Sequence, residues 1–328
     1  MMLSRSYHSF FIYKATLRQN DMTHTRRIFL TLFCWCCLSN MLWAQVDPAG
    51  GMRLYRTRSG HYAFHTLLND RVLSSVMIES GIHAALIDSA FIHKHQHELG
   101  LTIRPNNMNK EINLGGTVYR ITHRAKGSLR MSGCVYEGEF LVLSHYRNET
   151  EVTIPIQRLR QKNDWGSRIV MLDIKNSQMR MLTRDELRNW DCPRHKINHR
   201  SYMRMPAIST RIAITTSGST LFLEGNFNID LGNPMPLYLR EQSLEVQRFL
   251  NENKAITLTA GYNQRGEVVA QAFKPFSCEI LGHSLSLPTI CITDKLQRFT
   301  TDGLIGLPLF AEHAVAFDFE NDYLYIQE

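Results

Sequence analysis

Two short segments of the chain combine a carboxylate with a glycine two residues later: Glu79-Ser80-Gly81 and Asp230-Leu231-Gly232. Each follows an apolar run that is typical of a β-strand. A glycine at this place lets the turn tighten and brings the carboxylate close to a partner. Two carboxylates held face to face share one proton, because both cannot ionise together, and they can supply an acid and a base to one water molecule. The pattern therefore predicts a two-carboxylate hydrolytic site.

The segments around these acidic turns occur twice, in the same order. An apolar-Asp-apolar-x-Asn pattern that begins at Leu172 returns at Phe317, and a Cys-containing block at 132–138 is similar to 276–282. The two patterns are offset by 145 residues and the two acids by 151. Several blocks with the same order and similar offsets predict a duplication of two units.

Alternating apolar and polar residues, with glycine-containing turns between them, predict antiparallel strands and hairpins in each unit. Helices are expected only at residues 89–99, 184–190 and 241–252. The predicted fold class is all-β, with two similar lobes related by a pseudo-two-fold axis. Residues 45–182 would form the N-terminal lobe, 183–207 a linker, and 208–328 the C-terminal lobe. Each lobe has a hairpin after its acidic turn that could act as a flap, with these residues near the tips: Gly115, Gly116, Gly261 and Tyr262.

This order of strand, acid-x-Gly turn, flap hairpin, apolar-apolar-Gly motif and closing strand resembles that of the retropepsin-like and pepsin-like aspartic peptidases. The C-terminal unit is the better match: Asp230-Leu231-Gly232 stands where the family has Asp-Thr/Ser-Gly, and Leu304-Ile305-Gly306 is similar to its apolar-apolar-Gly motif. The resemblance covers residues 60–182 and 208–327. It implies a bilobed β fold built of acid-protease-type barrels and a peptide-binding cleft between the lobes. It also implies a catalytic pair, Glu79 and Asp230, and no metal or organic cofactor.

The departures from the family pattern bear directly on catalysis. Glu79 is one methylene longer than Asp, which displaces its carboxylate by about an ångström, and a shift of that size can cost on the order of a hundredfold in rate. Leu231 lacks the hydroxyl that ties one acidic turn to the other in the family, whereas Ser80 retains it. The first unit lacks an evident apolar-apolar-Gly motif, since 169–172 continues without a glycine.

Two functions therefore stay open on the sequence. The first is an aspartic-type endopeptidase. The alternative is a catalytically inactive member of the same fold that binds a peptide or glycan, or acts as a scaffold. A duplicated fold unrelated to peptidases is a third interpretation. In the first two cases the partner is a peptide, protein or glycan in the cleft. A single chain can hold both carboxylates, so a monomer suffices for the pair and the oligomeric state stays open.

The first 44 residues have the pattern of a secretory signal peptide. Arg26-Arg27 precedes an apolar run of eleven residues, 28–38, and Ala44 offers a small residue before the break. Eleven apolar residues are short of the ~20 needed to span a bilayer. Met22 is a better-placed start than Met1, which would make residues 1–21 an extension outside the natural chain. The expectation is an exported protein, periplasmic or secreted, with no stable membrane anchor.

The net charge of +7 comes largely from this leader. The rest of the chain has 32 Lys and Arg residues against 29 Asp and Glu residues. So small a balance gives no electrostatic reason to expect a nucleic-acid partner.

Four cysteines follow the leader: Cys134, Cys192, Cys278 and Cys291. In an oxidising compartment they permit three disulfide pairings, and small buried thiols are the alternative. The repeat assigns Cys134 and Cys278 to equivalent strand positions, as matched core thiols or as a bridge between the lobes. For Cys192, which has His195 and His199 nearby, a disulfide accounts for the residue better than a three-ligand zinc site.

Two other recurring patterns are interpreted as structural. His93 and His97 share one face of a predicted helix, with His95 between them, and we expect a solvated surface rather than a metal site. Asp173 and Asp318 repeat faithfully, and an Asp followed by an Asn most naturally shapes the turn before the next strand.

Overall fold

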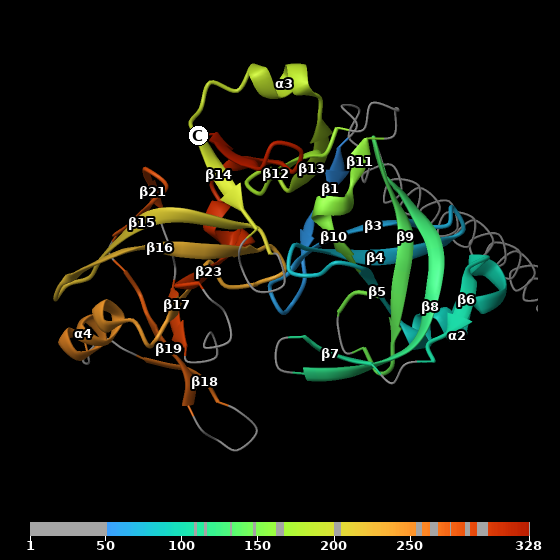
Figure 1. The fold of residues 1–328 in the computed structure, drawn as a ribbon, viewed down its shortest axis with the longest axis horizontal. Coiled ribbons are helices and arrows are strands. Elements are labelled where there is room, and N and C mark those ends of the chain that lie inside the picture. The colour runs from blue at the N-terminus through green and yellow to red at the C-terminus, as the bar shows by residue number, and fades with distance from the viewer. Residues whose placement is uncertain are drawn as a thin grey trace, which may run out of the picture. The chain divides into compact units, whose positions relative to one another are not determined.

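The computed structural model describes most of the chain after residue 50, namely residues 51–107, 110–114, 117–131, 133–146, 149–161, 167–199, 205–253, 258–262, 268–275, 277–285, 289–293 and 301–327. These residues fall within one compact unit, Pro48–Glu328. Strands far outnumber helices in this part of the chain, which confirms the all-β prediction at that level. Figure 1 shows the strands, coloured from blue to red along the chain.

The first sheet is built from the N-terminal half. Its strands follow one another across the sheet in the order β11 (Arg160–Gln161), β9 (Cys134–Leu143), β5 (Ala85–Asp88), β10 (Val152–Pro155), β4 (Val72–Glu79), β3 (Tyr62–Leu68), β8 (Thr117–Met131) and β6 (Thr102–Pro105). At its margins β2 (Tyr55–Arg56) pairs with β3, and β7 (Glu111–Leu114) pairs with β8. Helix α2 (Ser89–Leu99) follows β5 and is capped by Asp88, whose side chain accepts a hydrogen bond from Ala90 N at 3.1 Å.

The second sheet contains the strands of the C-terminal half of the chain, together with the hairpin at residues 169–182 that closes the N-terminal half. Its order is β1 (Met52–Arg53), β13 (Gln178–Leu182), β12 (Ile169–Asp173), β24 (Ala314–Asp318), β25 (Tyr323–Gln327), β14 (Arg194–Asn198), β15 (Ala207–Thr215), β16 (Thr220–Asp230), β23 (Gly303–Gly306), β17 (Leu237–Arg240), β22 (Ile290–Thr293), β19 (Val268–Phe273) and β18 (Leu258–Tyr262). β20 (Ser277–Ile280) joins β15 to β21 (His283–Leu285). The other helices in the described part of the chain are α3 (Arg184–Arg188), α4 (Leu244–Glu252) and the 3-10 turns η1 (Ile156–Arg158) and η5 (Leu307–Phe310).

The strand that ends on each acid has the same set of neighbours. β4 pairs in parallel with β10, β10 antiparallel with β5, and β5 in parallel with β9. β16 pairs in parallel with β23, β23 antiparallel with β17, and β17 in parallel with β22. In these registers Pro155 lies opposite Glu79, and Gly306 lies opposite Asp230. Each acid is thus held at the end of a strand that is paired on both sides.

These pairings correct the sequence alignment of the first unit. The segment 169–172 belongs to β12, which pairs with β13 and β24 rather than beside β4. The strand beside Glu79 is β10, which ends on Pro155 where β23 ends on Gly306. In the second unit that glycine allows a close backbone approach, since a Cβ there would lie 2.0 Å from Met235 O. A search for an apolar-apolar-Gly motif could not find β10, because Pro155 stands in β10 where Gly306 stands in β23.

The two closing hairpins, β12–β13 and β24–β25, have turns with the same hydrogen bonds. Asp173 accepts hydrogen bonds from Asn176 N at 2.9 Å and Asn176 Nδ2 at 2.8 Å. Asp318 accepts the same pair from Asn321, at 3.2 and 2.9 Å. Both aspartates therefore shape the turn, as the sequence predicts. β12 and β24 pair with each other in a register that places Met171 opposite Ala316.

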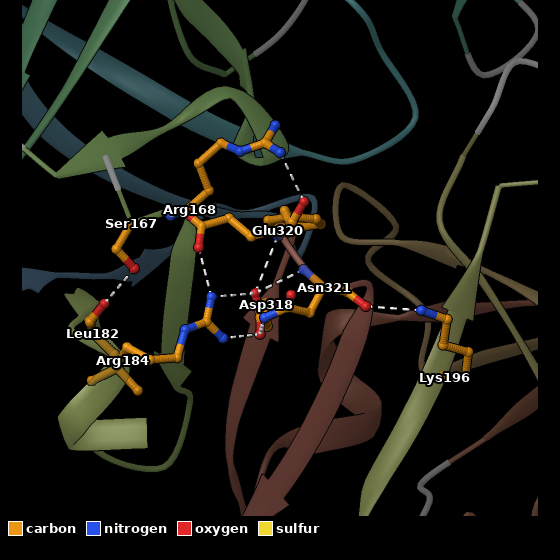
Figure 2. A network of polar contacts seen from close by, with 9 residues as sticks. Ser167, Arg168, Leu182, Arg184, Lys196, Asp318, Glu320 and Asn321 are labelled. Carbon is orange, nitrogen blue, oxygen red and sulfur yellow. Dashed lines mark hydrogen bonds and ion pairs between the residues drawn. The ribbon is translucent and has the colours of Figure 1, made fainter. Parts of the chain in front are cut away.

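Asp318 differs from Asp173 because it has an ionic partner. Its side chain is fully buried, and Arg184, the first residue of α3, makes a two-pronged contact with it while also reaching Glu320 at 2.6 Å. Figure 2 shows the Arg184 guanidinium between the two carboxylates. The Arg184 and Asn321 hydrogen bonds lower the pKa of Asp318 against the opposing effect of burial.

Part of the predicted linker is regular structure. Thr183 and Glu186 form a capping box at the start of α3, with Thr183 Oγ1 accepting from Glu186 N at 3.1 Å. Farther along, β14 pairs with both β25 and β15 and so lies within the second sheet. The predicted helices at 89–99, 184–190 and 241–252 correspond to α2, α3 and α4.

All four described cysteines are free thiols, so the predicted disulfide of Cys192 is wrong. Cys134 and Cys278 are buried, and burial raises the pKa of each thiol to about 12. Their predicted equivalence is also wrong. Cys134 begins β9 just after its turn, paired with Met131, whereas Cys278 lies on β20 before the corresponding turn. The sequence block was therefore aligned several residues out of register.

Candidate active site

The first acidic turn closes on its own carboxylate. Glu79 is the last residue of β4, and its Oε1 accepts hydrogen bonds from Ser80 N at 2.7 Å and Gly81 N at 2.8 Å. These two bonds to backbone N–H groups fix the orientation of the Glu79 side chain. The turn thus presents a carboxylate at the end of a paired strand.

The second acidic turn brings Asp230 against the first. The Asp230 carboxyl accepts the N–H of Gly232 and shares a hydrogen bond with the Glu79 side chain. Removal from water has the largest effect on the pKa of Asp230, followed by the negative charge of Glu79, and together they hold that pKa well above its ordinary value. The two predicted catalytic residues therefore meet, and this environment favours the protonated form of Asp230.

Ser80 ties the two acidic turns together. Its hydroxyl, in a residue only 1% exposed, donates to Ile229 O at 2.7 Å and accepts from Leu231 N at 2.9 Å. These are the backbone groups on either side of Asp230. Leu231, at the corresponding place in the second turn, is buried and offers no hydroxyl in return. The hydrogen bonds expected from the Ser80 hydroxyl to the second turn are present. Leu231 makes no equivalent side-chain bond to the first turn, because it has no hydroxyl.

Gly232 provides the space that the longer acid needs. A Cβ at position 232 would lie 2.0 Å from Glu79 Oε2, so any side chain there would displace that carboxylate. A Cβ at position 81 would instead have Met205 Cε as its nearest neighbour, at 3.1 Å. The longer side chain of Glu79 therefore uses the space left by Gly232 in the second turn, rather than the space beside Gly81 in its own turn.

Three residues near the pair were not singled out from the sequence. Gln157 Nε2 donates to Ile82 O at 2.8 Å and to Ser80 O at 3.3 Å, which braces the first turn from η1. Burial and the charges of Cys291 and Asp230 raise the pKa of the Tyr238 phenol to about 12, so Tyr238 lies within electrostatic reach of the pair. His61 contacts the second turn through Gly232 O. None of the three belongs to a sequence motif, and only their positions in the fold reveal them.

The other predicted features have separate outcomes. Gly115 and Gly116 lie outside the described residues, as does the predicted signal peptide at 1–44, so that flap tip and export stay predictions. Gly261 and Tyr262 end β18, which forms a hairpin with β19. His93 and His97 are exposed on α2. Across the described ranges, no three His, Cys, Asp or Glu side chains gather as metal ligands would.

No protein-family model matches the chain, and a search of curated proteins found no match. Within the described part of the chain, no helix has the length and apolar character needed to cross a membrane.

We expect Ser80→Ala to lower the free energy of unfolding by about 2 kcal/mol, because it leaves a buried carbonyl and a buried N–H without their partner. Any peptide cleavage should fall with it, since both groups flank Asp230. Chemical denaturation and a cleavage assay measure the two effects. Ser74→Ala is the matched control, because the Ser74 hydroxyl is equally buried but bonds only Thr66 O, at 3.2 Å, within its own hairpin. Equal losses in the two variants would contradict a special role for Ser80.

Proposed function

We propose that this protein is an aspartic-type endopeptidase in which Glu79 and Asp230 activate water for peptide hydrolysis. The observation that carries the proposal is the hydrogen-bonded carboxyl pair at the ends of two parallel-paired strands, with the pKa of Asp230 raised. A protonated acid beside an ionised one is what general acid–base hydrolysis at a single water molecule needs.

The chemistry assigns a different role to each acid. Glu79 removes a proton from water as the oxygen attacks the peptide carbonyl carbon, and Asp230 gives its proton to the carbonyl oxygen, which yields a neutral gem-diol. In the second step Glu79 returns its proton to the departing nitrogen, Asp230 takes a proton from one hydroxyl of the gem-diol, and the C–N bond breaks. Both acids then have their starting charge, and no metal or cofactor takes part in this scheme.

The pepsin-like, two-lobed architecture belongs to the same proposal. It is supported by the matching neighbours of β4 and β16 and by the shared Asp-Asn turn of the closing hairpins. The register between β12 and β24 adds to this, since Ile169 pairs with Asp318 and Asp173 with Ala314. A pseudo-two-fold axis between two related lobes would give that pairing.

A binding protein on the same fold is the second candidate. The observation that favours it is the missing tie at Leu231, which leaves the Ser80 hydroxyl as the tie between the turns. In that case the site would hold a peptide or glycan without cleaving it.

A peptide-library cleavage assay on protein starting at Gln45, from about pH 3 to 7, tests the proposal. The expected result is cleavage that persists at pH values above the ordinary aspartate pKa of 3.8, because the raised pKa keeps Asp230 protonated there. A peptide with a secondary hydroxyl in place of the scissile carbonyl should inhibit it by mimicking the gem-diol. Folded protein that cleaves nothing overturns the peptidase, and a thermal shift with the same hydroxyl peptide would then support the binding protein.

A further inference from the structure

A histidine from the N-terminal half reaches the second acidic turn. His61 precedes β3, and its Nδ1 lies 2.5 Å from Gly232 O. Because a carbonyl oxygen can only accept, the ring nitrogen must be the donor. Gly232 is the residue whose N–H donates to the Asp230 carboxyl and whose missing side chain makes room for Glu79. The His61 bond therefore acts on a residue that touches both acids of the pair.

His61 is held in place by a braced turn. Thr57 N donates to His61 O at 2.8 Å, and His61 N donates back to Thr57 Oγ1 at 3.1 Å. The Glu149 carboxylate accepts the N–H groups of Arg58 at 2.6 Å and Ser59 at 2.9 Å. These bonds fix the backbone from which the ring projects.

The same turn also packs against the acidic turn. Gly60 has φ +93°, a conformation that a side chain would strain, and a Cβ there would lie 3.0 Å from Pro234 Cβ. Pro234 lies two residues beyond Gly232. The turn therefore approaches the second acidic turn at two neighbouring points: His61 donates a hydrogen bond to Gly232 O, and the Gly60 backbone leaves no room for a side chain beside Pro234.

We propose that His61 is a positioning residue that fixes Gly232, and through it the Asp230 carboxyl, and so replaces the tie that Leu231 cannot make. This inference rests on the proposed peptidase function. The Ser80 hydroxyl, from the first acidic turn, hydrogen-bonds the backbone on either side of Asp230. The His61 ring, from the N-terminal half, hydrogen-bonds the carbonyl of Gly232, two residues after Asp230. With both contacts in place, the second acidic turn is held before and after its acid.

The test compares His61→Leu with His61→Asn. Leucine keeps much of the volume but has no donor, whereas the amide nitrogen of asparagine can stand where Nδ1 lies. We expect His61→Leu to lower kcat by about tenfold with little change in KM, in line with the large cost of small displacements at a reacting centre, and His61→Asn to restore most of it. His65→Leu is the matched control, because His65 lies on β3, the strand that follows His61, and stacks on Tyr55 within the same half.

A second readout does not depend on activity. The Gly232 N–H lowers the pKa of Asp230, so loosening Gly232 in His61→Leu should raise that pKa further, and carboxyl ¹³C NMR titration can follow it. Glu79 and Tyr238 are the other titratable groups acting on this carboxyl, and both are unchanged in the variants. If cleavage is absent from the wild-type protein but the Asp230 titration moves as expected, the peptidase proposal fails and the role of His61 stands. An unchanged titration in His61→Leu, or no rescue by His61→Asn in folded protein, overturns that role.

Discussion

Replacing Asp230 by asparagine should reduce peptide cleavage about 10³-fold, within the range that a positioned proton donor contributes. The amide has nearly the size of the carboxylic acid and can still accept the Gly232 N–H, but it has no proton to give to the substrate carbonyl. Cleavage of the best library peptide, measured as kcat/KM at the optimum pH, gives the comparison. Asp88→Asn is the control, because the Asp88 side chain caps α2 and asparagine also caps helices well.

The same variant should be at least as stable as the wild-type protein at neutral pH. Since the pKa of Asp230 is higher in the folded chain than in the unfolded one, the folded state binds the extra proton, and stability falls as pH rises between those two values. Asparagine removes this dependence. Melting temperatures at pH 7 and pH 4 should therefore differ less in the variant than in the wild-type protein. A variant that still cleaves, or that is destabilised at pH 7, would contradict the role and the protonation state given to Asp230.

The second large effect is expected at Arg184. Replacing it by alanine should lower the free energy of unfolding by about 3 kcal/mol, because the carboxylate of Asp318 is fully buried and loses its cationic partner. The hydrogen bonds from Asn321 remain and keep the loss at the lower end of what breaking a buried pair costs. Urea denaturation of both proteins at pH 7 measures the difference.

The effect of Arg184→Ala should depend on pH. Since the pKa of Asp318 is lowered in the folded state, the stability that its ionised form contributes is present above the unfolded pKa and is lost as pH falls through the folded pKa. The gap between wild type and variant should therefore narrow in acid. Arg188→Ala is the control: its ion pair with Asp185 is exposed, and pairs of that kind contribute well under about 1 kcal/mol. A similar loss in both variants would show that burial of Asp318 does not matter.

The sequence predicted the all-β class, the three helices α2, α3 and α4 and the aspartate turns correctly because each depends on local patterns. Strand alternation and an Asp-Asn pair specify their structure within a few residues. The meeting of Glu79 and Asp230 followed from the repeat, which is a long-range signal.

The errors arose where pairing across the sheet decides the answer. Pro155 occupies the place of Gly306, and no local pattern says that the proline strand lies beside Glu79. The cysteine block was aligned on the cysteines, whereas the turn glycines Gly133 and Gly282, with φ of 72° and 82°, mark the equivalent positions. The contact from His61 to Gly232 joins residues 171 apart in sequence, so only the folded chain reveals it.

The ladder between β12 and β24 bears on how such a chain can arise. The pairing is symmetric: the first residue of each strand lies opposite the last residue of the other, as Ile169 does opposite Asp318 and Ala314 opposite Asp173. Two identical strands from separate chains can form a ladder with this register. A protein of half this length could therefore form the same sheet as a homodimer. Under the proposed duplication, joining two such units in one chain lets each unit change on its own. One unit then has a serine after its glutamate and the other a leucine after its aspartate, a difference that two identical subunits could not have.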